Sequence, residues 1–212
     1  EGNAVRYGLY AIKSLGRPVI DSIIGERKKG GSYRTLQDFI ERTVQRDINK
    51  RAIENLIKAG ACDGLDGNRH QMSIVYTSIV DDVVRRKKTG LEGQMSLFDF
   101  VGEEDKKDYE VHYPNVEEFP KEVLLGFEKE VLGIYLSGHP LEDYLGKMKK
   151  NVTANAADFV REEESGTIRV TDNMHVVVGG MIAAKTVKYT RNNQAMAFLT
   201  VEDLTGSVEI IV

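Results

Sequence analysis

The sequence predicts an α+β protein with more than one domain, in which an all-helical part is followed by a connector and by the first strands of a β-barrel. Apolar residues recur every three or four positions through the first ninety residues, which is the spacing of amphipathic helices. From Met174 onward the pattern changes to β-branched runs of strand length. A polar stretch rich in glycine and charge separates the two parts at residues 89–118.

The first helices are bounded by residues with clear preferences for helix ends. Pro18 suits the first turn of a helix, where its missing N–H costs nothing, and a Gly-Gly pair at 30–31 ends the apolar repeat that follows. Thr35 and Asn49 precede the next two apolar repeats. Their side chains can accept hydrogen bonds from backbone N–H groups, so both are expected to be N-caps.

The longest helix is expected to start at Asn68, with Gln71 three residues later as in a capping box. The basic run at 85–88 falls at its C-terminal end, where the helix dipole favours cations. Its apolar face comprises Met72, Val75, Tyr76, Ile79, Val80, Val83 and Val84.

The chain is predicted to divide into four segments. Residues 1–90 form a helical domain, residues 91–118 a connector, and residues 119–170 a helical connecting segment that opens at Pro120. Residues 171–212 supply the N-terminal strands of a truncated barrel.

Three runs in the last segment are expected to be strands, at residues 175–189, 194–203 and 207–212. Arg-Asn-Asn and Leu-Thr-Gly turn signals separate them. Glycines interrupt the first run, which is typical of strongly bent strands in barrels.

The composition excludes several classes of protein. No apolar run approaches the roughly 18 residues that cross a bilayer, so no membrane association is expected, and no secretory signal peptide is visible. The single cysteine, Cys62, excludes an internal disulfide framework and favours a reducing cytoplasm. The four histidines are scattered, so no metal site is expected.

Charge is distributed unevenly. Residues 1–90 carry 17 Lys/Arg against 11 Asp/Glu, a formal charge of +6, and residues 91–212 carry 12 against 22, a formal charge of −10. A basic first part could bind a polyanion. It could equally be the solvated surface of helices, and charge alone leaves both interpretations open.

Two glycine-containing turns join helices in the basic part, at residues 14–16 and 59–61. A hairpin before a helix N-terminus leaves backbone N–H groups free, which together with the helix dipole suit a phosphate. Such contacts are independent of base sequence and sensitive to salt. The residues expected to contact duplex DNA are Lys13, Ser14, Leu15, Gly16, Arg17, Lys58, Gly60, Ala61, Asn68 and Arg69.

This arrangement resembles a tandem helix-hairpin-helix, a module that binds the DNA backbone. The alternative is that Gly16 and Gly60 are only helix C-caps. Ser14 stands where the module commonly has glycine, and a positive φ at that position would strain a serine.

Five strings, in order along the chain, resemble the alpha subunit of bacterial DNA polymerase III. They are RYGLYAIKSLG, INKRAIENLIKAGACDGL, GQMSLF, EKEVLGIYLSGHPLEDY and AFLTVEDLTGSVEIIV. The resemblance implies a region beyond the polymerase fingers, with a tandem helix-hairpin-helix for duplex DNA, a sliding-clamp-binding peptide and an OB-fold near single-stranded template. It also implies other replicase subunits as partners and a bacterial, nucleoid-associated location.

In the polar connector, the resemblance assigns clamp binding to Gln94, Met95, Ser96, Leu97 and Phe98. Gln94 would bond at the rim of a pocket, and Leu97 and Phe98 would fill its apolar floor. The alternative is that apolar residues of this stretch fold back onto the chain's own helices.

The OB-fold would have five strands, of which three are recognised here. Candidate contacts to a single strand are Lys185, Lys188, Tyr189, Arg191 and Phe198. Phe198 alternatively faces the barrel core.

No catalytic residues are expected in this chain. The family's catalytic aspartates and the Mg²⁺ ions they hold belong to a palm domain that these residues do not match. A helix-hairpin-helix glycosylase or lyase with Asp38 as its catalytic carboxylate is an alternative, although Thr35 and Asp38 fit a capping box. An RNA-binding OB module like the anticodon domain of a class II aminoacyl-tRNA synthetase is another. His139, before Pro140, is expected only to shape a turn.

Overall fold

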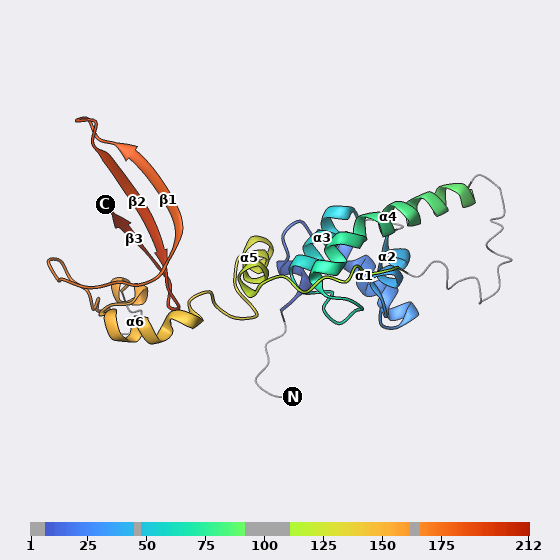
Figure 1. The fold of residues 1–212 in the computed structure, drawn as a ribbon, viewed down its shortest axis with the longest axis horizontal. Coiled ribbons are helices and arrows are strands. Elements are labelled where there is room, and N and C mark those ends of the chain that lie inside the picture. The colour runs from blue at the N-terminus through green and yellow to red at the C-terminus, as the bar shows by residue number, and fades with distance from the viewer. Residues whose placement is uncertain (1–6, 45–47, 92–110, 162–165) are drawn as a thin grey trace. The chain divides into compact units, whose positions relative to one another are not determined.

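The chain forms two compact units, Glu1–Leu136 and Ser137–Val212 (Figure 1). The first is helical and the second contains a three-stranded antiparallel sheet, which confirms the predicted α+β class. The computed structural model describes residues 7–44, 48–91, 111–161 and 166–212.

Helices of the first unit begin at the capping residues that the sequence predicts. The Thr35 side chain accepts a hydrogen bond from Asp38 N, and Asn49 accepts one from Ala52 N. Asn68 and Gln71 form the expected reciprocal capping box, with N···O distances of 2.9 and 2.8 Å. The elements are η1 (Leu9–Ala11), α1 (Arg17–Gly30), α2 (Leu36–Thr43), α3 (Lys50–Lys58), α4 (Arg69–Leu91) and α5 (Lys121–Leu132).

The core of this unit also includes α5. Val131 and Leu132 are buried in the cluster formed by α1 to α4, and Lys13 N donates to Val131 O over 2.8 Å. The compact units therefore do not follow the expected boundaries, which placed this helix in a connecting segment at 119–170. The reason is tertiary packing, because the apolar face of α5 is buried by helices far away in the sequence.

The second unit begins with short helices and ends in the sheet. Its elements are η4 (Glu142–Tyr144), α6 (Leu145–Asn151), η5 (Ala156–Phe159), β1 (Met181–Tyr189), β2 (Ala195–Glu202) and β3 (Ser207–Ile211). The strands form a meander in the order β1-β2-β3, which is consistent with the opening strands of an OB-fold.

Strand β1 is shorter than the run that the sequence indicates, since it begins at Met181 and not at residue 175. Gly180 explains part of this boundary. A Cβ at Gly180 would lie 2.6 Å from both Val201 Cγ1 and the Glu202 carbonyl oxygen, so the chain enters the sheet where only glycine fits.

Asp203 ties the sheet to the short helices. Its buried carboxylate accepts hydrogen bonds from Ala156 N at 2.7 Å, from Thr205 N at 2.7 Å and from Gly206 N at 3.1 Å. Burial opposes ionisation, but these hydrogen bonds outweigh it and lower the pKa of Asp203. The loop after β2 is thus held by a charged group.

Candidate nucleic-acid interface

The first hairpin has its strained residue at serine. Ser14 has φ 65°, the condition under which a serine is expected to be strained, whereas Gly16 is an extended N-cap with φ −74°. Leu15 between them is 7% exposed and belongs to the core. Packing thus removes the Leu15 side chain from the surface, and the expected contact of this hairpin residue with DNA stays a prediction for its backbone alone.

The element before this hairpin is a single 3-10 turn, Leu9–Ala11, and not the full helix that the sequence suggests. The turn after it still presents the N-terminus of α1 to solvent. Arg17, the first residue of α1, is exposed and lies 6.0 Å from the Tyr10 ring centroid. Its guanidinium has no ion-pair partner in the described part of the chain.

A groove of about 570 Å³ lies beside the hairpin. Four cations and two carboxylates line it, so its local charge is positive. Lys13 Nζ donates to the Glu130 carbonyl oxygen over 2.8 Å. The lining residues are Lys13, Ser14, Lys50, Arg51, Glu54, Asn55, Lys58, Glu130 and Val131.

The groove brings in two cations that sequence reasoning missed, Lys50 and Arg51. They occupy the first turn of α3, which contains no acidic residue. Cations there are disfavoured by the helix dipole unless an anion accompanies them. Two cations in a first turn without an acidic residue were therefore the feature of the sequence that could have indicated an anion site. Lys50 pairs with Asp81 over 2.7 Å, but both side chains are largely exposed and such a pair is weak. Arg51 has no ion-pair partner among the described residues.

Lys58 lies on the groove wall with two carboxylates. Its Nζ is 3.0 Å from Glu54 Oε1 and 3.0 Å from Glu130 Oε1. Burial acts to lower the pKa of Lys58, but hydrogen bonds with Glu130 and Glu54 outweigh it and the pKa is raised. Lys58 therefore stays charged, and its charge is already partly neutralised.

The second hairpin is built around a buried arginine. Gly60 has φ 74°, and a Cβ at this position would collide with the Arg69 guanidinium. Arg69 is 8% exposed, bonds Asp63 through two nitrogens at 2.6 and 2.8 Å, and lies 3.5 Å from Glu128 Oε1. The carboxylates of Asp63 and Glu128 and the Lys58 carbonyl oxygen thus occupy the guanidinium, which argues against the predicted phosphate contact by Arg69.

The N-terminus of α4 is occupied as well. Arg69 N and His70 N donate to the Glu118 carboxylate at 2.8 and 3.0 Å. Burial raises the pKa of Glu118, but these bonds and one from Phe119 N outweigh it, and the net shift is downward. A protein carboxylate thus takes the place that we expected for a phosphate.

Of the remaining predicted residues of this hairpin, Asn68 has structural hydrogen bonds and Ala61 is exposed. Asn68 is committed to the capping box and to the Val116 carbonyl oxygen at 3.1 Å, so it is not a free phosphate donor. Ala61 is exposed at the turn. Its backbone N–H donates to the Leu56 carbonyl oxygen over 3.0 Å and closes the end of α3. The second hairpin is therefore largely self-satisfied.

In the sheet, strand register separates the predicted single-strand residues. Thr186 is paired with Phe198, and directly opposed residues share a face. Lys188 lies on that face, with its Nζ 5.1 Å from the Phe198 ring centroid. Lys185 and Tyr189 alternate onto the other face. The five residues thus do not form one surface.

Phe198 does not point to the side that carries the core pattern. The opposite face of β2 carries Leu199 and Val201, and Val201 is buried. Phe198 is half-buried beneath Lys188, which favours the stacking interpretation over the core one. Arg191 is exposed in the β1–β2 turn, which Thr190 N closes onto the Gln194 carbonyl oxygen over 2.9 Å.

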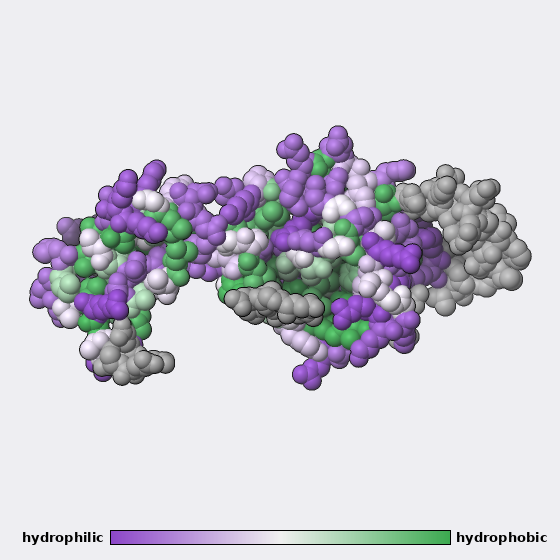
Figure 2. Space-filling model, turned by 90° about the horizontal axis from the view of Figure 1, so that it is seen from below, coloured by the Kyte–Doolittle hydropathy of each residue, from purple (hydrophilic) through white to green (hydrophobic). Residues whose placement is uncertain are grey.

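Apolar residues remain at the surface of both units (Figure 2). In the sheet these include Val187, Tyr189 and Ile211, of which Tyr189 is 71% exposed.

The other candidates have structural partners or lie outside the described residues. Asp38 Oδ2 accepts from Arg34 N, the residue before the Thr35 N-cap, at 3.0 Å and pairs with Arg42 at 3.3 Å, so this carboxylate has structural partners. His139 Nδ1 accepts from Leu141 N at 3.1 Å, which fits the expected turn. The stretch Gln94, Met95, Ser96, Leu97 and Phe98 lies outside the described residues.

Among the described residues, no three His, Cys, Asp or Glu side chains come together as a metal site. No helix in the same ranges combines the length and apolar character needed to cross a membrane.

The first unit is of the helix-hairpin-helix class. Its residues 1–72 match the family model described as the helix-hairpin-helix motif. Curated relatives then extend over the whole chain. DNA polymerase III subunit alpha of Borreliella burgdorferi is 34% identical over 99% of this chain and 18% of its own length. Those of Saccharopolyspora erythraea and Vibrio cholerae are each 33% identical, over 99% and 100% of this chain and 18% and 17% of their own lengths. The chain belongs to the DNA polymerase III alpha-subunit family and spans less than a fifth of these relatives.

Proposed function

We propose that the first unit binds the phosphate backbone of duplex DNA, without reading sequence, as part of a replicative polymerase. The observation that carries this proposal is the groove of about 570 Å³ where Lys13, Lys50 and Arg51 converge beside the first hairpin. Backbone phosphates are the polyanion that a helix-hairpin-helix typically holds, and contacts of this kind release counterions.

Helix N-termini give the second argument. Arg17, Lys50 and Arg69 each begin a helix whose first turn has no acidic residue. For α4 the chain supplies its own anion, Glu118. At α1 no described side chain caps the first turn, and at α3 the Asn49 side chain takes Ala52 N while the exposed Asp81 pairs with the Lys50 side chain. An external phosphate at α1 and α3 would satisfy the N–H groups and cations together.

A salt titration tests this proposal. The affinity of a fluorescently labelled duplex is measured by anisotropy at several salt concentrations, for the wild type, Arg51→Ala and Arg27→Ala. Arg27 is an exposed helical arginine near the end of α1 and does not line the groove, so it matches the charge change.

Losing one phosphate contact should reduce the slope of log affinity against log salt by about 0.9 in Arg51→Ala. The slope of Arg27→Ala should equal that of the wild type. Equal slopes for all three proteins would contradict the groove assignment.

Clamp contact is the finer part of the proposed function. The Gln94–Phe98 stretch matches the pattern Gln-x-x-Leu-Phe and lies in a polar connector, which supports it as a tether. Holding the DNA and the clamp through one chain would strengthen two weak interactions by effective concentration. Binding of this chain to a bacterial sliding clamp should be lost in Leu97→Ala/Phe98→Ala, and retained binding would contradict the assignment.

The sheet is proposed to lie against single-stranded template. The Lys188–Phe198 face and Arg191 in the adjacent turn support this, since cations beside an aromatic ring suit a base and its phosphate. Single-stranded oligonucleotide binding should weaken in Lys188→Ala/Phe198→Ala. The variant Lys185→Ala/Tyr189→Ala removes one cation and one ring from the other face and is the matched control. Equal losses in the two would argue against a specific face.

The named relatives support the wider setting. We propose that the full-length protein is a DNA-directed DNA polymerase acting in replication with other replicase subunits in the bacterial cytoplasm, and that this segment holds nucleic acid without carrying the catalytic step. A primer-extension assay tests the last point, and extension by this chain alone would overturn it.

A further inference from the structure

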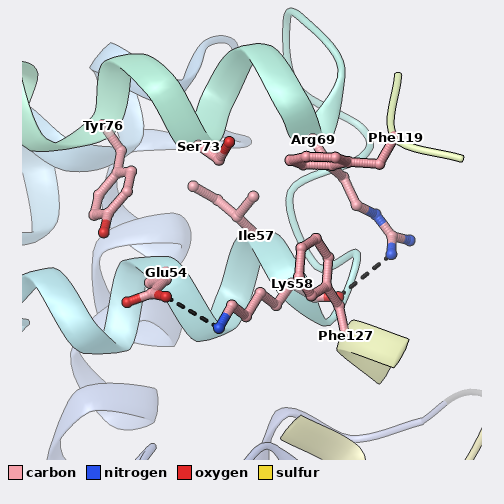
Figure 3. Close-up of a pocket in the computed structure, with 8 residues that line it drawn as sticks. All are labelled: Glu54, Ile57, Lys58, Arg69, Ser73, Tyr76, Phe119 and Phe127. Carbon is pink, nitrogen blue, oxygen red and sulfur yellow. Dashed lines mark hydrogen bonds and ion pairs between the residues drawn. The ribbon is translucent and has the colours of Figure 1, made fainter. Parts of the chain in front are cut away.

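A smaller pocket lies beside the groove on α3. Its volume is about 200 Å³, and it is lined by α3, α4, α5 and the segment before α5. Figure 3 shows side chains of α3 and α4 facing one another, with the two phenylalanines at one end. The lining residues are Glu54, Ile57, Lys58, Arg69, Ser73, Tyr76, Phe119 and Phe127.

Pocket and groove are neighbours, because Glu54 and Lys58 line both. These two side chains form an ion pair at 3.0 Å, at the place where the pocket and the groove meet. A ligand with a phosphate in the groove could therefore place an attached group in the pocket without leaving α3.

The walls of the pocket suit a flat ring. Phe119 and Phe127 meet edge to face with centroids 5.2 Å apart, and Tyr76 lies across the pocket from them. Lys58 Nζ is 5.5 Å from the Phe127 ring centroid, so a cation borders the aromatic wall. Stacking on such rings is tolerant of base identity.

Polar groups are present where the edge of a ring would lie. The Tyr76 hydroxyl has no hydrogen-bond partner among the described residues, and it is directed toward the α3 side in Figure 3. The Ser73 hydroxyl donates to the His70 carbonyl oxygen over 2.7 Å, which leaves its lone pairs free to accept. One free donor and one free acceptor are what the edge of a nucleobase can use.

We propose that this pocket receives the base of an unpaired nucleotide whose backbone phosphate lies in the adjacent basic groove. The inference rests on the proposed backbone binding, and it adds a preference for DNA that carries an unpaired base. An apolar protein side chain fits less well, because the paired charges of Glu54 and Lys58 would lose contact with water without gaining a polar group of the ligand.

The test compares two duplexes that differ by one nucleotide. One is blunt, and the other carries a single unpaired 2-aminopurine at its end, in separate 5′ and 3′ versions. Affinity is measured by competition, and 2-aminopurine fluorescence reports stacking. The blocking variant is Ser73→Leu, which fills the pocket from α4.

Ser78→Leu is the matched control. Ser78 is on the same helix and donates to the carbonyl oxygen three residues back over 2.7 Å, as Ser73 does, but it does not line the pocket. Tyr76→Phe is a second variant, which keeps the ring and removes the hydroxyl. Thermal unfolding of each variant establishes that it is folded.

For the wild type and Ser78→Leu, an unpaired 2-aminopurine should raise affinity about fivefold and be quenched on binding. In Ser73→Leu both effects should disappear while blunt duplex binds as before. Tyr76→Phe should retain quenching and lose part of the affinity gain. If the unpaired base adds nothing, or Ser73→Leu and Ser78→Leu behave alike, the pocket assignment is overturned while groove binding stands. If no duplex binds with salt dependence, the proposed function itself fails.

Discussion

Replacing Arg69 by methionine should destabilise the first unit and leave its DNA affinity unchanged. The substitution keeps an unbranched, flexible side chain and removes the guanidinium. Glu128, 1% exposed, then loses the guanidinium 3.5 Å away, so a buried carboxylate loses this compensating cation. Breaking a buried pair on one side costs about 3–5 kcal/mol. Leu136 N still donates to Glu128 at 2.7 Å, which places the expected loss near the lower end. Asp63 is half-exposed and adds little, because water solvates it.

Urea unfolding followed by far-UV circular dichroism measures this loss, because most of the helix lies in the first unit. The double variant Arg69→Met/Glu128→Gln should recover much of it, since no buried charge remains. DNA affinity is measured in parallel at low temperature, where the variants are folded. An unchanged free energy of unfolding, or a lower salt slope for DNA binding in Arg69→Met, would show that the side chain serves the ligand and not the fold.

Three further predictions concern backbone strain and a buried carboxylate. Gly60→Ala should destabilise by about 2–3 kcal/mol in urea unfolding, because its φ is 74° and the new Cβ would displace Arg69. Ser14→Gly should stabilise by up to about 1 kcal/mol in the same assay, since it removes side-chain strain at φ 65° but adds freedom to the unfolded chain. Asp203→Asn should destabilise the sheet unit by about 2 kcal/mol at neutral pH. The pKa of Asp203 is lowered by folding, so its stabilisation is complete above the unfolded pKa and disappears as pH falls through the folded one. The gap between wild type and variant should therefore close below about pH 4 in thermal unfolding.

Each has a distinct control. Gly64→Ala lies in the same loop, where a Cβ meets nothing within 4 Å and φ is not positive, so it should change stability little. Destabilisation by Ser14→Gly would mean that the serine side chain stabilises the hairpin. A pH-independent gap for Asp203→Asn would mean that shape and not charge holds the loop.

Local features of this protein could be predicted from the sequence. Thr35, Asn49 and the Asn68–Gln71 pair begin helices where expected, because capping depends on groups within three residues of each other. For Ser14 the sequence raised a positive φ only as a condition, and the structure shows that the condition holds. The helical part and the sheet part could be predicted because the spacing of apolar residues depends only on neighbouring positions in the sequence.

Only the tertiary structure decided which charged groups can face a ligand. In the sequence, Arg69 and Lys58 are both cations beside a glycine turn. In the structure, Arg69 is a buried structural residue, because it pairs with Glu128, which lies 59 residues away. Glu118 fills the N-terminus of α4 from 49 residues away. Lys50 and Arg51 join Lys13 in one groove, and strand register divides Lys188 from Lys185. Sequence by itself determined where helices start and which family the chain resembles. The folded chain determined which positive charges can contact a ligand. This depends on burial and on carboxylates distant in the sequence, and neither can be predicted from neighbouring residues.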